Sequence, residues 1–304
     1  MFWQLSSRPA RRRRAPSPPV ERLDVIDLHF AEHMATGLEV DLPGRGTAFV
    51  RIADGPQGAR TVLLVHGMLA TADLNWSLAI PTLSSRFRVV APDLRGHGRG
   101  TPTRRFAADE CADDLAAIVN ALDLGPVIVV GYSLGGMVAQ VFMHRHPELV
   151  VGLVLCATAC SFQVPTEQPA VRFVAGAARR MPDGLRRAAM LALLRPRSAN
   201  SPRGRWLMAQ VRAHDTRALL EAIAEVANFN SEAWIGATAC PAAVILTMED
   251  RVVSPASQRL MSDSLAESTV YELAADHFAC VKLPDEFNAT LLTACVGLGS
   301  CEPD

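Results

Sequence analysis

Short apolar runs alternate with longer amphipathic stretches along most of this 304-residue chain. The runs are rich in Val, Leu and Ile and barely alternate between apolar and polar positions, which is typical of strands buried on both faces of a parallel sheet. Predicted strands cover residues 38–42, 48–52, 61–65, 88–91, 127–130, 153–156, 243–247 and 269–272. Predicted helices lie near residues 73–84, 107–122, 134–146, 255–265 and 284–296. This alternation predicts the α/β fold class, with a sheet covered by helices on both faces.

One stretch, residues 161–236, departs from the alternation. It contains no convincing strand, but Ala-, Arg- and Leu-rich segments near residues 167–180, 184–194, 203–212 and 215–228 have helical periodicity. Prolines and glycines, among them Pro182 and Pro202, separate these segments. We therefore expect a helical insertion after the sixth strand, within a core formed by residues 20–160 and 237–304.

Charge is distributed unevenly along the chain. The 30 basic and 31 acidic residues give a net charge of −1, which argues against a dedicated nucleic-acid binder. The first 20 residues contain five arginines and no acidic residue, and residues 1–19 are expected to form a disordered basic tail. Such a tail could contact an anionic membrane surface, but simple solvation is the preferred interpretation.

The sequence indicates neither membrane insertion nor secretion. No run approaches the roughly 18 consecutive apolar residues of a membrane-spanning helix, and prolines occupy the part of the basic leader where a signal peptide would be apolar. The seven cysteines are scattered and form no C-x-x-C pair, so free thiols are expected instead of disulfides or a zinc site. These features predict a cytoplasmic protein.

The pentapeptide Gly131-Tyr132-Ser133-Leu134-Gly135 has the G-x-S-x-G pattern of a nucleophile elbow. It follows the predicted strand at residues 127–130 and begins the predicted helix at residues 134–146, which is the context that an elbow requires. The sharp turn exposes the serine hydroxyl at the N-terminus of a helix, where the helix dipole favours negative charge on the attacking oxygen. Ser133 is therefore the candidate nucleophile.

A serine nucleophile needs a base, and the base is held in turn by a carboxylate. His277 is the one histidine after the last predicted strand, on a loop at the sheet edge that also carries the serine. Asp250 follows the strand at residues 243–247 at the same edge, although its neighbour Glu249 is an alternative acid. We predict a triad of Ser133, His277 and Asp250.

The backbone N–H groups of Met68 and Leu134 are the candidate donors of an oxyanion hole. Met68 follows the strand at residues 61–65, and Leu134 follows the nucleophile. His66 is expected to orient the loop that carries Met68 and not to act as a base. Four aromatic side chains are candidates for a substrate pocket: Trp76, Tyr132, Phe173 and Trp206. Helical spacing favours Phe173 and Trp206 as core residues of the insertion, and Trp76 has a comparable ambiguity between pocket and core.

Taken together, these segments resemble the α/β-hydrolase superfamily, in its branch of cap-bearing esterases and lactonases. The resemblance covers roughly residues 38–297 and rests on L-V-H-G at 64–67, A-P-D-L-R-G-H-G at 91–98, G-Y-S-L-G-G at 131–136, E-D-R-V-V at 249–253 and D-H-F at 276–278. It implies an eight-stranded, mostly parallel sheet, with residues 161–236 as a helical cap. The chain departs from the family at Thr247 and Asp276, where glycine is usual, and at Lys282, where glutamate is common.

The sequence therefore predicts a serine hydrolase that cleaves a small carboxylic ester or lactone through an acyl-enzyme, with no cofactor and no metal. C–C bond hydrolysis, acyl transfer and perhydrolysis by the same residues are alternatives, as is a ligand-binding protein that keeps the fold. No G-x-G-x-x-G opens a helix after a strand, and no H-E-x-x-H is present. The predicted partner is a small-molecule substrate, with no nucleic acid, and the oligomeric state is left open.

Overall fold

The computed structural model describes residues 13–14, 35–103, 105–162, 177–195, 200–238 and 240–299. The eight predicted strands are present as β2 (Thr36–Leu42), β3 (Gly46–Ala53), β4 (Thr61–Val65), β5 (Arg88–Pro92), β6 (Val127–Tyr132), β7 (Val150–Cys156), β8 (Ala242–Thr247) and β9 (Ser268–Leu273). A two-residue strand, β1 (Arg13–Arg14), pairs with β2. It falls within the segment predicted as a disordered tail, whose other residues lie outside the described ranges.

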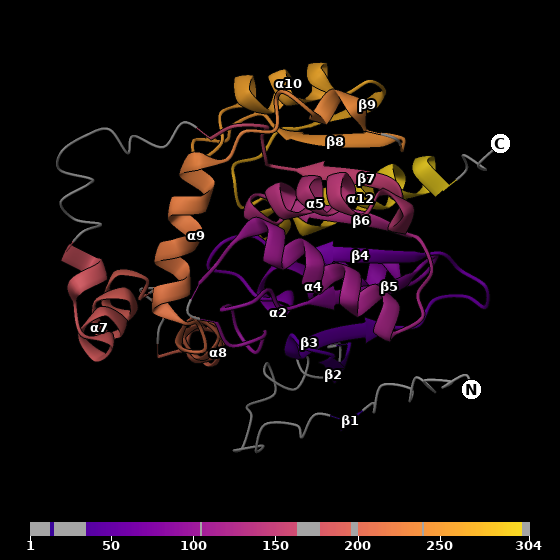
Figure 1. Cartoon of the computed structure of the whole chain (residues 1–304). Helices are drawn as coiled ribbons and strands as arrows, with labels where there is room; N and C mark the ends of the chain where they lie inside the picture. The colour runs from indigo at the N-terminus through magenta and orange to yellow at the C-terminus, as the bar shows by residue number, and fades with distance from the viewer. Residues whose placement is uncertain are drawn as a thin grey trace, which may run out of the picture.

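All the strands form one sheet in the order β1-β2-β3-β5-β4-β6-β7-β8-β9. β3 is antiparallel to both β2 and β5, whereas every neighbouring pair from β5 through to β9 is parallel. The sheet is therefore mostly parallel, as the sequence predicts. In Figure 1 the arrowheads of the parallel strands point to the same edge, where the loops that carry the candidate site begin.

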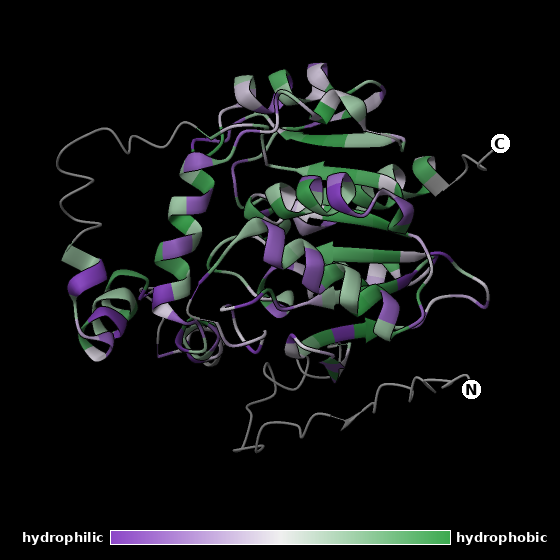
Figure 2. Cartoon of the chain, viewed as in Figure 1, coloured by the Kyte–Doolittle hydropathy of each residue, from purple (hydrophilic) through white to green (hydrophobic). Residues whose placement is uncertain are grey.

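Helices cover both faces of the sheet (Figure 1). Leu63 and Val65 of β4 pack toward α4 (Ala108–Ala121) and α5 (Leu134–Arg145), while Val62 and Leu64 pack toward α2 (Ala72–Trp76), α3 (Ile80–Leu83) and α12 (Pro284–Gly299). All four side chains are fully buried, and burying a Val or Leu contributes about 1.5–3 kcal/mol. This double burial explains the uninterrupted apolar runs of the central strands, and β4 and β7 accordingly appear mostly green in Figure 2.

The single helix predicted near residues 73–84 is wrong, because the structure has two short helices there, α2 and α3. Pro81 lies in the first turn of α3. A proline ring inside a continuous helix would clash with the carbonyl four residues earlier, at Ser77, and would remove a hydrogen bond. The helix therefore ends at Trp76 and a new one begins at Ile80.

Three described helices lie between β7 and β8: α7 (Asp183–Leu193), α8 (Pro202–Arg212) and α9 (Thr216–Asn228). Side chains of Ser201 and Asp215 cap α8 and α9 by accepting hydrogen bonds from N–H groups of the first turn. The ends of this helical insertion meet where Ser161 bridges to Asn230. Residues 163–176, with most of the first predicted insertion helix, lie outside the described residues.

The remaining helices follow β8 and β9: α10 (Pro255–Ser264) and the short α11 (Ala279–Lys282), with α12 after it. Short 3-10 turns occupy η1 (Pro147–Leu149) and η2 (Ile235–Ala237). Within the described ranges, no helix combines the length and apolar character needed to cross a membrane. The six cysteines in those ranges are free thiols.

Candidate active site

Ser133 lies in the tight turn between β6 and α5, with φ of 54° and ψ of −118°. This positive φ is strained for a residue with a side chain. Small neighbours make the turn sterically feasible: a Cβ on Gly131 would lie 2.4 Å from the Gly135 carbonyl oxygen, and a Cβ on Gly135 would lie 2.1 Å from the carbonyl oxygen of Val65. The Ser133 side chain does not cap α5, so its hydroxyl is free to bond elsewhere.

That hydroxyl forms one end of a hydrogen-bonded chain of three side chains. Ser133 Oγ lies 3.0 Å from His277 Nε2, and His277 Nδ1 lies 2.7 Å from Asp250 Oδ2. The order of contacts requires the imidazole to donate its Nδ1 proton to the carboxylate and to accept from the serine. The three residues predicted as a triad are thus adjacent in space, although 144 positions separate the serine from the histidine.

The Asp250 carboxylate is buried and fully bonded. Besides His277, it accepts hydrogen bonds from the backbone N–H groups of Val252 (2.7 Å) and Val253 (2.9 Å) and from Thr247 Oγ1 (2.8 Å). Burial alone would raise the pKa of Asp250, but the hydrogen bond from His277 and the backbone N–H bonds prevail and lower it. Glu249, the alternative acid, is exposed.

Two residues near Asp250 have a role that no motif signals. Thr247 stands where the family usually has glycine, and its hydroxyl donates to Asp250 while accepting from Gln258 Nε2 at 2.9 Å. Gln258 is itself fully buried, on α10, and its Oε1 accepts from the Thr247 backbone N–H at 3.1 Å. The departure from glycine therefore adds a hydrogen bond that holds the carboxylate in place.

His277 is held by its backbone as well as by its ring. The buried Tyr132 donates its hydroxyl to the His277 carbonyl oxygen at 2.8 Å, which ties the histidine loop to the residue before the nucleophile. The neighbouring Asp276 accepts from the Phe278 backbone N–H at 2.9 Å and pairs with Lys282. The Lys282 hydrogen bond lowers the pKa of Asp276, and the ammonium group of Lys282 balances the carboxylate charge.

The loop after β4, which carries the candidate donor Met68, contacts the serine. A Cβ on Gly67 would lie 3.5 Å from Ser133 Cβ, so this loop contacts the nucleophile directly. The Gly67 carbonyl oxygen bonds to His66 Nδ1 (2.8 Å) and accepts from the Ala70 N–H (3.2 Å). Because a trans peptide directs its N–H opposite its carbonyl, these two bonds also fix the direction of the Met68 N–H.

His66 orients this loop, as the sequence suggests. Its Nε2 accepts from the Leu94 N–H at 2.9 Å, so the proton must lie on Nδ1, the nitrogen that faces Gly67 O. The ring is fully buried, and burial lowers its pKa to about 3. His66 is therefore neutral and committed to two backbone contacts, and it has no contact with the serine hydroxyl among the described hydrogen bonds.

Leu134, the other candidate donor, is the first residue of α5. The first N–H groups of a helix have no carbonyl partner within the helix and point toward the positive end of its dipole. Met68 and Leu134 thus lie on the two segments that flank Ser133, one on the adjacent loop and one on the helix that the serine begins.

The candidate pocket residues have separate surroundings. Trp76 is fully buried between Tyr132 and Phe287, with ring centroids 6.0 and 6.4 Å away, so it packs in the core. Trp206 is half-buried on α8, and Phe173 lies outside the described residues.

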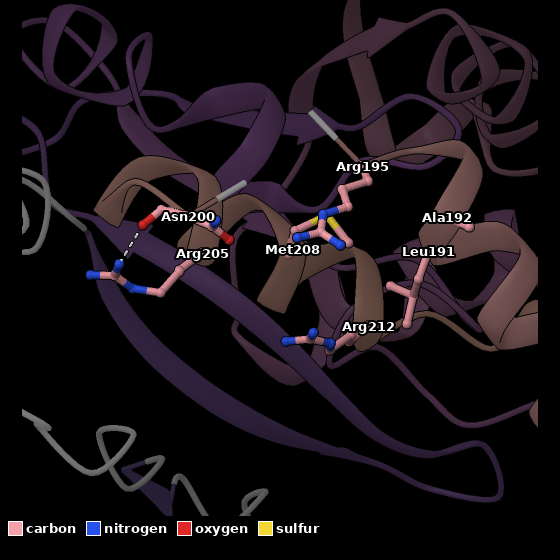
Figure 3. A pocket seen from close by; sticks show the side chains of 7 residues that line it. All are labelled: Leu191, Ala192, Arg195, Asn200, Arg205, Met208 and Arg212. Carbon is pink, nitrogen blue, oxygen red and sulfur yellow. Dashed lines mark hydrogen bonds between the residues drawn. The ribbon is translucent and has the colours of Figure 1, made fainter. Parts of the chain in front are cut away.

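A cavity of about 440 Å³ lies between α7 and α8 (Figure 3), where Leu191, Met208 and three arginines line it, and no residue of the Ser133–His277–Asp250 chain does. Within the described residues, no cluster of three His, Cys, Asp or Glu side chains could hold a metal ion.

Comparison with known proteins identifies the family of the chain. Residues 60–282, most of the chain, match the family described as the alpha/beta hydrolase fold. The chain belongs to this family. The α/β hydrolase is 31% identical over 197 residues to the pimeloyl-[acyl-carrier protein] methyl ester esterase of Chromobacterium violaceum, covering 62% of this chain and 76% of that one. With relatives of this kind, the protein is a hydrolase.

Two further similarities imply less about the activity of the protein. The α/β hydrolase is 38% identical over 105 residues to the magnesium-chelatase 30 kDa subunit of Rhodobacter capsulatus, but this match covers 34% of the chain and only 37% of that relative. The structure of a thermophilic esterase from Thermogutta terrifontis superposes with a TM-score of 0.69 at 24% identity, over 87% of this chain and 99% of that one. The second likeness concerns the fold alone.

Proposed function

We propose that this hydrolase cleaves a small carboxylic ester or lactone, with Ser133 as nucleophile, His277 as general base and acid, and Asp250 as the residue that orients the imidazole. The observation that carries the proposal is the continuous chain of hydrogen bonds from Ser133 Oγ through His277 to Asp250 Oδ2, at 3.0 and 2.7 Å. An ester-cleaving relative supports the choice of substrate class.

The mechanism follows from which atoms the chain connects. His277 Nε2 takes the hydroxyl proton as Ser133 Oγ attacks the carbonyl carbon, and the buried Asp250 carboxylate stabilises the imidazolium that forms. The imidazolium then gives the proton to the leaving alcohol, which departs as the acyl-serine forms. Water repeats the sequence on the acyl-enzyme and releases the carboxylic acid.

Negative charge on the substrate oxygen would be stabilised by the N–H groups of Met68 and Leu134. The Met68 donor is prearranged, because its peptide is held through Gly67 O before any substrate binds. Losing one such donor typically costs about 3–4 kcal/mol of transition-state stabilisation. We further propose that the helical insertion covers this site as a cap, since it contacts the loop that carries Met68.

A screen of p-nitrophenyl esters of graded acyl length, together with simple lactones, tests the proposal. The wild type should hydrolyse at least one of them, and Ser133→Ala should lower kcat by about 10⁴-fold or more. Ser85→Ala, which removes an exposed serine, is the matched control and should keep wild-type rates. An unchanged rate in Ser133→Ala would refute the proposed role of the serine.

Product analysis with competing acceptors then separates the reactions that one acyl-enzyme could support. Added methanol or hydrogen peroxide diverts the acyl group only if it reaches Ser133 in place of water. Hydrolysis predicts the free acid as the main product in their presence, whereas an acyltransferase or perhydrolase would yield mainly the methyl ester or the peracid.

A further inference from the structure

His214 lies in the helical insertion, at the junction between α8 and α9, and its side chain is fully buried. Its Nδ1 accepts a hydrogen bond from the Gly98 N–H at 3.1 Å, and its Nε2 lies 3.3 Å from the Leu69 carbonyl oxygen. Because a backbone N–H can only donate and a carbonyl can only accept, the ring is neutral with its proton on Nε2. One side chain of the insertion therefore joins two separate loops of the sheet domain.

The bond to Leu69 acts on an unusual piece of backbone. Leu69 has φ of 60°, in the left-handed region that residues other than glycine avoid. Residues 67–70 form a β-turn closed by the Ala70 N–H to Gly67 O bond, and Leu69 takes the position of a type II turn where glycine is preferred. The same turn carries the Met68 N–H, the candidate oxyanion donor, one residue before Leu69.

Nearby contacts from the same junction reinforce this attachment. Thr71 Oγ1 donates to Gln210 Oε1 of α8 at 3.0 Å, and the Asp215 N–H donates to the Gly96 carbonyl oxygen at 3.0 Å. A Cβ on Gly96 would lie 2.2 Å from Ala218 Cβ, so α9 packs tightly on this loop. Of these contacts, the His214 bond is the one made to Leu69, the residue of the turn with the left-handed φ.

We propose that His214 is a positioning residue: its Nε2–H holds the Leu69 carbonyl, keeps the 67–70 turn in its strained form, and thereby fixes the Met68 N–H beside Ser133. The inference rests on the proposed function, in which that N–H stabilises the oxyanion. It gives the insertion a part in catalysis besides covering the site, because the turn depends on a donor that the insertion supplies. Displacing a stabilising group by about 1 Å can cost as much as 100-fold in rate.

Two substitutions of His214 distinguish the roles of its two ring nitrogens. In His214→Gln the amide nitrogen replaces Nε2 and can still donate to Leu69 O. In His214→Asn the shorter side chain can replace Nδ1 and accept from Gly98, but it leaves Leu69 O without its donor. We expect His214→Asn to lower kcat about 10-fold or more with KM changed less than about 2-fold, and His214→Gln to stay within about 3-fold of the wild-type kcat.

Rates are expressed per active site titrated by a fluorophosphonate, so that a loss of folded protein does not count as a loss of turnover. His144→Asn is the matched control, because His144 is exposed and stacks on Trp234, and it should behave as wild type. Equal effects of Gln and Asn at position 214, with unchanged kcat per titrated site, would mean that His214 only stabilises the fold. That result would overturn the proposal.

Amide hydrogen exchange at residues 67–70 reads the turn without relying on activity. His214→Asn should raise exchange at Ala70 by about 10-fold or more, and His214→Gln should not. Unchanged exchange in His214→Asn overturns the proposal even if the wild type is an active esterase. Conversely, a wild type that cleaves no ester but shows this exchange pattern would refute the proposed function, while the hold of His214 on the turn would stand.

Discussion

At the scale of single residues, the site depends on a strained backbone conformation at the nucleophile, which its neighbours hold in place. Ser133 has a strained backbone with φ of 54°, and its N–H and carbonyl are both bonded, to Cys156 O and from Thr158 Oγ1, each at 2.9 Å. Such a conformation costs about 1–3 kcal/mol and persists only when the surroundings impose it. The cost is met here by the strand and helix on either side of the serine.

The ion pair beside the histidine gives a testable dependence on pH. Asp276 directly precedes His277 and forms an ion pair with Lys282, and both side chains are partly exposed. Removing the cation in Lys282→Ala leaves Asp276 to stabilise the imidazolium, so the acidic limb of the pH profile of kcat/KM should move to higher pH. Because solvent screens exposed charges, a shift of only about 0.3 pH units is expected.

Two further variants, Asp276→Gly and the double variant, supply the control for this prediction. Asp276→Gly leaves the Lys282 cation unbalanced, and the acidic limb should then move to lower pH. The double variant should restore the wild-type profile. If all three profiles coincide with that of the wild type, the pair has no influence on the ionisation of the base.

At the scale of elements, contacts at glycines join β4, β6 and α5 closely enough to form the elbow. Gly135→Ala would place a methyl group 2.1 Å from the Val65 carbonyl oxygen of β4, a backbone atom that cannot turn aside. We expect a loss of about 3 kcal/mol or more in the free energy of unfolding, measured by urea denaturation.

Gly184→Ala is the matched control, since Gly184 lies in α7 and a Cβ there meets nothing within 4 Å. It should raise the free energy of unfolding by about 0.5 kcal/mol, because alanine loses less conformational freedom in a helix than glycine does. Similar effects of the two substitutions would contradict the close approach of α5 to β4.

The elements were predictable wherever local pattern and burial agree. The central strands β4 to β8 follow from apolar runs because both of their faces are buried, and the elbow follows from glycine spacing around Ser133. The α2–α3 region was mispredicted because helical periodicity continues past Ser77 while Pro81 interrupts the backbone. The contacts of Thr247 and Gln258 with Asp250 could not be predicted, since a hydroxyl and an amide on different elements carry no sequence signal of proximity.

At the scale of the whole molecule, three buried histidines make stability depend on pH. The rings of His66, His97 and His214 lie in a row with 5.3 Å between neighbouring centroids, and burial lowers all three pKa values, to about 3 for His66 and about 4 for His214. In the unfolded chain these rings would take up protons near pH 6.5. Stability is therefore complete above pH 6.5 and falls as pH decreases toward 4.

Asp93 has the opposite effect on stability. Burial raises its pKa to about 6, so on acidification the folded state binds this proton at a higher pH than the unfolded chain does. With three histidines against one aspartate, the unfolded state binds about two more protons near pH 5. The free energy of unfolding should then fall by about 3 kcal/mol from pH 5.5 to pH 4.5. Urea denaturation at the two pH values measures this, and a constant value would show that the histidines are not buried as neutral rings.

Covalent labelling of the wild type by a fluorophosphonate, with the site located by peptide mass spectrometry, is the most direct test of Ser133 as an activated nucleophile. We expect one label per chain, on Ser133, and a labelling rate at least about 10³-fold lower in His277→Ala, because an unactivated serine hydroxyl is a poor nucleophile. Absence of a label on Ser133 in the folded wild type, or equal labelling of His277→Ala, would contradict it.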